Sequence, residues 1–139
     1  QGPCLKGNGW QLPLTLAQGK KLMDKGYMDK MVTLGIRAED FHEQQWGEAW
    51  LEVLADVREM LGAEVLLHGR VCGDGEAARH GTAQGEPVRD SLNWENSPHI
   101  CAKLPPSCCV KAGGRVRLYV DMGRIKLFDT ITEENILYV

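Results

Sequence analysis

Glycines that stand beside lysines could bind phosphate groups, and we consider these residues first. A phosphate-binding loop requires the pattern G-x-x-x-x-G-K-[ST], because its glycines let backbone N–H groups wrap the phosphates and its lysine neutralises them. The sequence does not contain this pattern. The nearest fragments are Gly19-Lys20-Lys21, with no glycine at the required upstream spacing, and Gly73-Asp74-Gly75, with no lysine. We therefore predict that the chain does not bind ATP.

The histidines are candidates for metal binding. None of them stands in an H-x-x-x-H or H-x-x-E-H pattern, although His99 and Cys101 could supply two ligands from one strand face. A structural zinc ion needs four protein ligands, and no second pair occurs at a useful spacing. We therefore expect no metal site. The four histidines are His42, His68, His80 and His99.

The five cysteines include no C-x-x-C pair, and the adjacent Cys108 and Cys109 suit neither a disulfide framework nor a zinc knuckle. We expect reduced, half-buried thiols in a cytoplasmic protein. A cysteine–histidine nucleophile stays open at this point, because such partners meet in space and not along the chain. No feature of the sequence supports it.

Two tryptophans, Trp46 and Trp50, stand at i and i+4 and have two interpretations. They could form an exposed platform for a ligand, or they could pack in the core, as large aromatic side chains usually do. We favour packing in the core.

The composition is that of an ordinary soluble domain. The chain has 139 residues, of which 43% are hydrophobic and 25% charged, and this length can bury a sizeable core. Its net charge is −3 with scattered charges, so nucleic acid is not an expected partner. The apolar runs are far shorter than the roughly 20 residues of a membrane-spanning helix, and no secretory signal opens the sequence. We expect one domain over residues 1–139, or two small β lobes.

The hydrophobic pattern predicts several short strands. The alternation is clearest from Val32 to Ile36 and indicates a half-buried strand. Residues 17–31 predict a solvent-exposed turn of helix that breaks at Gly26, and Lys111-Ala112-Gly113-Gly114 predicts a turn. Short strands between glycine turns indicate a mainly β fold, a small barrel or sandwich. The other predicted strands cover residues 10–14, 64–71, 100–104, 116–120 and 125–128.

Three further segments complete the expected architecture. Residues 46–61 fit both a helical and a strand period, and their Glu, Leu, Ala and Arg content favours a helix. Residues 39–45 are polar and should form an exposed loop. Residues 72–96 are rich in glycine and lack an apolar period, so we expect a long loop or an irregular hairpin there.

The segment Val32-Thr33-Leu34-Gly35-Ile36-Arg37-Ala38-Glu39-Asp40 resembles a known pattern, v-x-l-G-I-R-P-E-[DH]. It opens the regulatory region of the ATPase subunits of maltose-type and multiple-sugar ABC importers, where proline usually stands at the position of Ala38. Three later pieces follow in the family's order over roughly residues 10–139. They are Leu61-Gly62-Ala63-Glu64-Val65, similar to l-G-a-E; Lys111-Ala112-Gly113-Gly114-Arg115-Val116, similar to k-x-G-x-x-v; and Asp121-Met122, Lys126-Leu127-Phe128-Asp129 and Glu134-Asn135-Ile136, similar to f-D-m, h-l-F-D and t-x-x-x-I.

This resemblance implies an OB-like β-barrel, often called a TOBE or MOP-like domain. It also implies a strand over residues 51–60, which replaces the helix that propensity favours. Arg37 is expected to pair with Glu39 or Glu64, and the alternative is an arginine that stays solvated. The positions that match the family's motifs are implied to be structural and not catalytic. They are Gly35, Ile36, Arg37, Glu39, Asp40, Gly62, Glu64, Gly113, Phe128 and Asp129.

The function that the resemblance implies is that of a regulatory and dimerisation domain without ATPase chemistry. ATP and magnesium would bind in a nucleotide-binding domain that this chain lacks. The implied partners are a second copy of the chain, that nucleotide-binding domain, the transporter's membrane subunits and, in some members, a regulatory protein. The parent would be cytoplasmic, at the inner face of the plasma membrane.

Two alternatives belong to other classes. The first is a free-standing OB- or MOP-like protein that binds a small ligand or anion, for which Gly113-Gly114-Arg115 is the nearest thing to a cradle. The second is a small cysteine enzyme.

Overall fold

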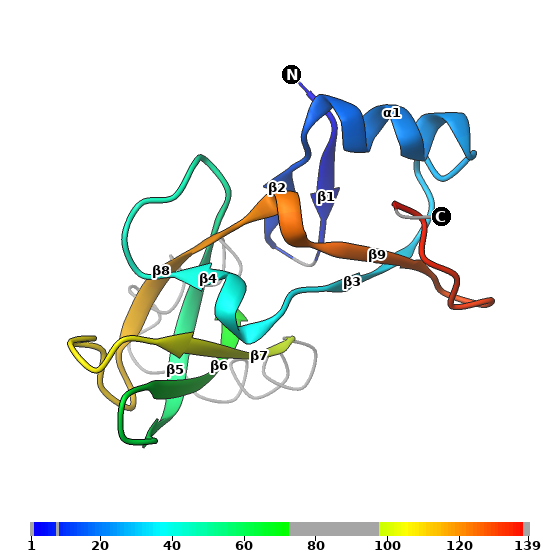
Figure 1. Cartoon of the computed structure of the whole chain (residues 1–139). Coiled ribbons are helices and arrows are strands. Elements are labelled where there is room, and N and C mark those ends of the chain that lie inside the picture. Colours follow the sequence, from blue (N-terminus) through cyan, green and yellow to red (C-terminus); the bar gives the residue numbers. More distant parts are fainter. Residues whose placement is uncertain (1, 8, 73–97, 138–139) are drawn as a thin grey trace.

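The structure is a computed structural model that describes residues 2–7, 9–72 and 98–137. The predicted loop at residues 72–96 lies outside the described residues except for Cys72, which ends a strand. Mainly β architecture with one short α-helix is confirmed (Figure 1). In chain order the elements are β1 (Cys4–Lys6), β2 (Gln11–Pro13), α1 (Leu16–Asp24), β3 (Val32–Gly35), the 3₁₀ turn η1 (Ala38–Asp40), β4 (Phe41–His42), β5 (Trp50–Met60), β6 (Val65–Cys72), β7 (His99–Leu104), β8 (Arg115–Val120), the 3₁₀ turn η2 (Met122–Arg124) and β9 (Lys126–Asp129).

Five strands form a nearly closed antiparallel barrel in the order β4-β8-β5-β6-β7. The edge strands of this sheet, β4 and β7, lie close to each other, since β7 contacts both η1 and β4. Inward-facing side chains of every long strand fill the interior, and Val53, Leu67 and Leu118 are fully buried. The barrel therefore has one continuous hydrophobic core, as the OB-like prediction required.

Strand β5 settles the ambiguity at residues 46–61. Leu51, Val53 and Ala55 are buried while the residues between them are half-exposed, which is the period of a strand. The helix that propensity favoured is wrong, and the strand implied by the family resemblance is confirmed. Pairing with β6 on one side and β8 on the other satisfies the backbone of β5 and outweighs the intrinsic preference of its residues.

A β-bulge interrupts the pairing of β5 and β6 between Ala55 and Val57. Gly69 lies opposite Ala55, and a Cβ atom at Gly69 would stand 2.6 Å from the carbonyl oxygen of Leu54. The close approach of the two backbones therefore requires glycine at this position.

The remaining elements pack beside the barrel as a β1-β2 hairpin, the helix α1 and a two-stranded β3-β9 ribbon (Figure 1). The helix begins with a capping box, in which Thr15 and Gln18 exchange side-chain to backbone hydrogen bonds. It is followed by Gly26 at φ 80°, so the predicted helix and its break are both confirmed. No helix in the described ranges is long and apolar enough to span a membrane.

Two predictions about exposure are wrong. Residues 39–45 were expected to form an exposed loop, but they include the end of η1 and all of β4, and both Asp40 and Phe41 are buried. Trp46 was expected in the core, but it is 48% exposed and stacks on the His42 ring at 4.1 Å between ring centroids. The neighbouring Trp50 is half-buried under the guanidinium of Arg117.

Candidate functional site

The segment with the strongest family resemblance leads into a buried carboxylate, Asp40. Its side chain is 4% exposed, and the Nε of Arg124 donates to its Oδ1 at 2.8 Å. The backbone of Asp40 also accepts a hydrogen bond from the N–H of Asp121. Its other carboxylate oxygen, Oδ2, is buried without a hydrogen-bond partner in the described part of the chain. The pair therefore joins η1 to η2, two turns that are distant in the sequence.

A second carboxylate, Asp129, is fixed at the end of β9. The hydroxyl of Tyr27 donates to its Oδ2 at 2.6 Å, and the N–H groups of Ile131 and Thr132 donate to its Oδ1 at 2.7 and 2.8 Å. The Tyr27 bond, followed by these backbone bonds, lowers the pKa of Asp129 to about 2. The same bond raises the pKa of Tyr27. Asp129 is therefore a permanent anion at neutral pH and not a proton carrier.

Helix α1 anchors the segment that follows β9. The ammonium groups of Lys21 and Lys25 donate to the carbonyl oxygens of Leu137 and Ile136 at 2.5 and 2.6 Å. The side-chain amide of Gln18 donates to the carbonyl of Met122 at 2.6 Å. The polar face of α1 thus holds η2 and the chain around residue 136, and its lysines serve structure.

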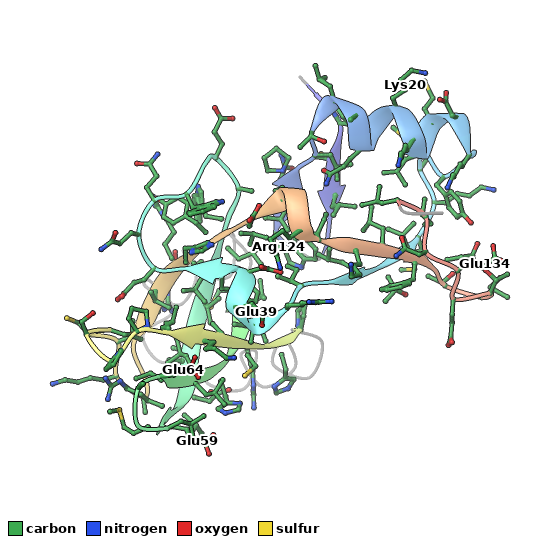
Figure 2. The ribbon with its side chains drawn as sticks, in the orientation of Figure 1. Lys20, Glu39, Glu59, Glu64, Arg124 and Glu134 are labelled. Carbon is green, nitrogen blue, oxygen red and sulfur yellow. The ribbon has the colours of Figure 1, made fainter. Side chains whose placement is uncertain are left out.

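The motif positions fall in three separate places. The motif residue Asp40 lies in η1 beside its partner Arg124. The motif residue Glu64 lies at the far end of the barrel, near Glu59 (Figure 2). Gly62 and Gly113 occupy turns at φ 72° and 87°. Gly35 and Phe128 pack together in the β3-β9 ribbon, where a Cβ at Gly35 would lie 3.4 Å from the Phe128 ring. The motif therefore marks joints of the fold and does not converge on one catalytic centre.

The predicted partners of Arg37 are wrong. Among the described residues Arg37 forms no ion pair, and Glu64 instead lies 4.0 Å from Lys103. Arg37 is exposed at the start of η1, next to the exposed Glu39, and the half-buried Ile36 packs against the core. The carboxylate that does find an arginine is Asp40, whose partner is 84 positions away in the sequence.

The backbone N–H groups of Gly113 and Gly114, the candidate site for an anion, already donate hydrogen bonds within the fold. The N–H of Gly113 donates to the carbonyl of Ala55 at 2.7 Å, and that of Gly114 donates to the carbonyl of Lys111 at 2.9 Å. Gly19, from the nearest approach to a phosphate loop, lies inside α1 and donates to the Thr15 carbonyl. These amides cannot wrap an anion without breaking hydrogen bonds.

The described residues contain no group of three or more histidine, cysteine, aspartate or glutamate side chains placed to hold a metal ion. His99 and Cys101 both belong to β7. Burial, followed by the nearby charge of Glu59, raises the pKa of the Cys101 thiol. Such a thiol is a poor nucleophile, because the thiolate is the reactive form.

Two hollows were not foreseen from the sequence. The larger, about 1050 Å³, lies between the β1 hairpin, residues 27–36 and the ends of β6 and β7. The smaller, about 240 Å³, lies between β2 and the start of β5 and is lined by Trp10, Trp50 and the carboxylates Glu48 and Glu52. Their lining residues come from segments that are far apart in the sequence. They could be predicted only after the pairing of the strands is known.

Comparison with known proteins gives a distant relative with a transport function. No family model matches the chain. The chain is 26% identical over 130 residues to the "Oligosaccharides import ATP-binding protein MsmX" of Bacillus subtilis strain 168. This alignment covers 88% of the chain and 29% of MsmX, in the C-terminal part of that protein, beyond its ATPase domain. The chain thus spans less than a third of the length of this relative.

Proposed function

We propose that this chain is the regulatory and dimerisation domain of the ATP-binding subunit of a carbohydrate ABC importer. The similarity to MsmX carries the proposal, because it extends over 88% of the chain while leaving most of MsmX unmatched. ATP hydrolysis would then belong to a separate domain of the parent protein, and this chain would have no reaction of its own. Its partners would be a second copy, that ATPase domain and the transporter's membrane subunits, at the inner face of the plasma membrane.

The contacts described above suit such a role. The motif residues Asp40 and Asp129 make contacts within the fold, Asp40 with Arg124 and Asp129 with Tyr27. A rigid domain of this kind can hold two ATPase domains together at high effective concentration while they open and close. A twofold symmetric contact is the commonest way for such a pair to close.

A chimera tests the proposal. This chain replaces the C-terminal part of MsmX in a Bacillus subtilis strain that lacks the native protein, and oligosaccharide uptake is measured. We expect more uptake than with MsmX truncated at the same point, because the chain restores the contact between subunits. A chimera that accumulates and hydrolyses ATP but supports no more uptake than the truncated protein would reject the proposal.

The dimer is tested separately by sedimentation of the chain at tens of micromolar. We expect a concentration-dependent shift from monomer to dimer, as for a weak symmetric contact. A single monomeric species over that range would remove dimerisation from the proposed role.

A further inference from the structure

The smaller hollow has the composition of a recognition site. It lies where β2 contacts β5, and its volume is about 240 Å³. Two indole rings, two carboxylates and one amide surround it. The lining residues are Trp10, Gln11, Pro13, Glu48, Trp50, Leu51, Glu52 and Cys72.

Both indole rings are held in place by the fold. The Trp10 ring lies so close to Gly7 that a Cβ atom there would be 2.0 Å from its Cε2. The Trp50 ring is covered by the guanidinium of Arg117, 3.9 Å from its centroid. Arg117 is paired in register with Glu52 on β5, and it belongs to the neighbouring strand β8. Rings fixed in this way lose little conformational freedom when a ligand binds.

The carboxylates, the amide and the indole N–H groups around the hollow make no hydrogen bonds or ion pairs with other described residues. The carboxylates of Glu48 and Glu52 have no hydrogen-bond or ion-pair partner within the described chain, nor do the side-chain amide of Gln11 and the indole N–H groups of Trp10 and Trp50. The residues that carry these donors and acceptors line one space, and their polar groups do not satisfy one another. A ligand rich in both kinds of group would satisfy them.

We propose that this hollow binds one pyranose ring of a neutral saccharide. The two indole rings would contact the apolar C–H faces of the sugar, and Glu48, Glu52 and Gln11 would bind its hydroxyl groups. Sites for small molecules typically have apolar and aromatic walls with a small number of polar groups that fix the orientation of the ligand. Small OB-like barrels also bind oligosaccharides on their strands and loops.

The charges of the hollow distinguish a sugar from other ligands. Glu48 and Glu52 repel an anion. Arg117 already covers one face of the Trp50 ring, and its positive charge disfavours a second cation on that ring. A neutral ligand meets neither obstacle. The proposal does not rest on the role in an importer, so either can fail without the other.

The experiment follows the indole N–H signals of the ¹⁵N-labelled full chain during titration with glucose, galactose and maltose, and in a separate titration with choline. We expect saturable shifts of the Trp10 and Trp50 signals, assigned with Trp10→Phe and Trp50→Phe. The Trp46 signal should not move, because that ring stacks on His42 outside the hollow. Glu52→Gln should weaken binding about tenfold, since it removes a charged hydrogen-bond acceptor.

The matched control is Glu59→Gln, an exposed carboxylate on the same strand that does not line the hollow, which should leave the affinity unchanged. Dispersed amide spectra show that each variant is folded. The proposal is overturned if none of the sugars gives a saturable shift up to about 100 mM, well above the range of a weak millimolar site. It is also overturned if Glu52→Gln binds like the parent chain, or if only choline gives a saturable shift, which would make the hollow a cation site.

Discussion

The hydroxyl of Tyr27 donates to the carboxylate of Asp129 at 2.6 Å, across 102 positions of the sequence. Tyr27 follows helix α1, and Asp129 is the last residue of β9. The bond therefore ties the region after the helix to the ribbon strand that comes last in the chain. It also sets the charge of the carboxylate, from which a dependence on pH follows.

We expect Asp129 to make stability fall in acid. Its pKa is about 2 in the folded chain against an ordinary value of 3.8, so folding favours the anion. The contribution is fully present above about pH 4 and is lost as the pH falls through about 2. Urea unfolding at a series of pH values should show this loss in the parent chain. It should be reduced in Tyr27→Phe and absent in Asp129→Asn, whereas Asp24→Asn, in an exposed pair on α1, should keep the profile of the parent chain.

Removing the partner of Asp40 should cost stability. Arg124→Met leaves a carboxylate that is 4% exposed without its charged donor. Because Arg124 itself is 56% exposed, we expect a loss of about 1–3 kcal/mol in the free energy of unfolding. The control is Arg37→Met, an exposed arginine with no ion pair in the described chain, which should change stability by less than about 0.5 kcal/mol. Equal effects of the two substitutions in denaturant unfolding would contradict the role of the pair.

Proline at position 38 should stabilise the fold. Ala38 is the first residue of η1, and Arg37 before it has φ −73° and ψ 151°, a conformation that suits a residue preceding proline. Among the described residues the Ala38 N–H has no acceptor that proline would take away. We expect Ala38→Pro to raise the free energy of unfolding by about 0.4–1 kcal/mol and Ala38→Gly to lower it. A melting temperature that falls in the proline variant would show that this turn differs from the family's.

An added methyl group at the bulge should be costly. The Cβ of Gly69→Ala would stand 2.6 Å from a backbone oxygen of Leu54, which cannot move without disturbing the β5 ladder. We expect a loss of about 1–3 kcal/mol from this overpacking. Gly2→Ala has open space around it and should be neutral. A Gly69→Ala chain as stable as the parent would show that the two strands separate easily at the bulge.

The chain alone should not bind ATP. Of the two fragments nearest to a phosphate loop, Gly19-Lys20-Lys21 lies within α1, where the Gly19 N–H is already bonded to Thr15, and Gly73-Asp74-Gly75 lies outside the described residues. Calorimetry with magnesium and ATP should give no heat of binding at micromolar concentrations. A micromolar affinity would mean that another part of the chain holds the phosphates.

Strands with a strict alternation could be predicted from the sequence, and β3 is the best example. Strand β5 could not, because its composition suits a helix and only its pairing with β6 and β8 decides between the two. The family resemblance supplied that information. The burial of Asp40 was invisible for a similar reason, because its partner Arg124 is brought to it only by the complete fold.

The hollow between Trp10 and Trp50 shows the same limit. The sequence singled out Trp50 together with Trp46, as residues one helical turn apart, whereas the strand geometry separates them. Trp46 stacks on His42, whereas Trp50 and Trp10 line the same hollow. No spacing along the chain relates Trp10 to Trp50, because the contact of β2 with β5 creates their proximity.

The β3-β9 ribbon has a consequence for the order of folding. It pairs residues 32–35 with residues 126–129, whereas β5 and β6 are joined by a short turn. Closing the larger loop costs more chain entropy, so the β5-β6 hairpin can form early and the ribbon closes late. We expect contacts made only after that closure, such as Tyr27 with Asp129, to slow unfolding and to have little influence on the rate of folding. We therefore expect substitutions in the ribbon to speed unfolding more than they slow folding.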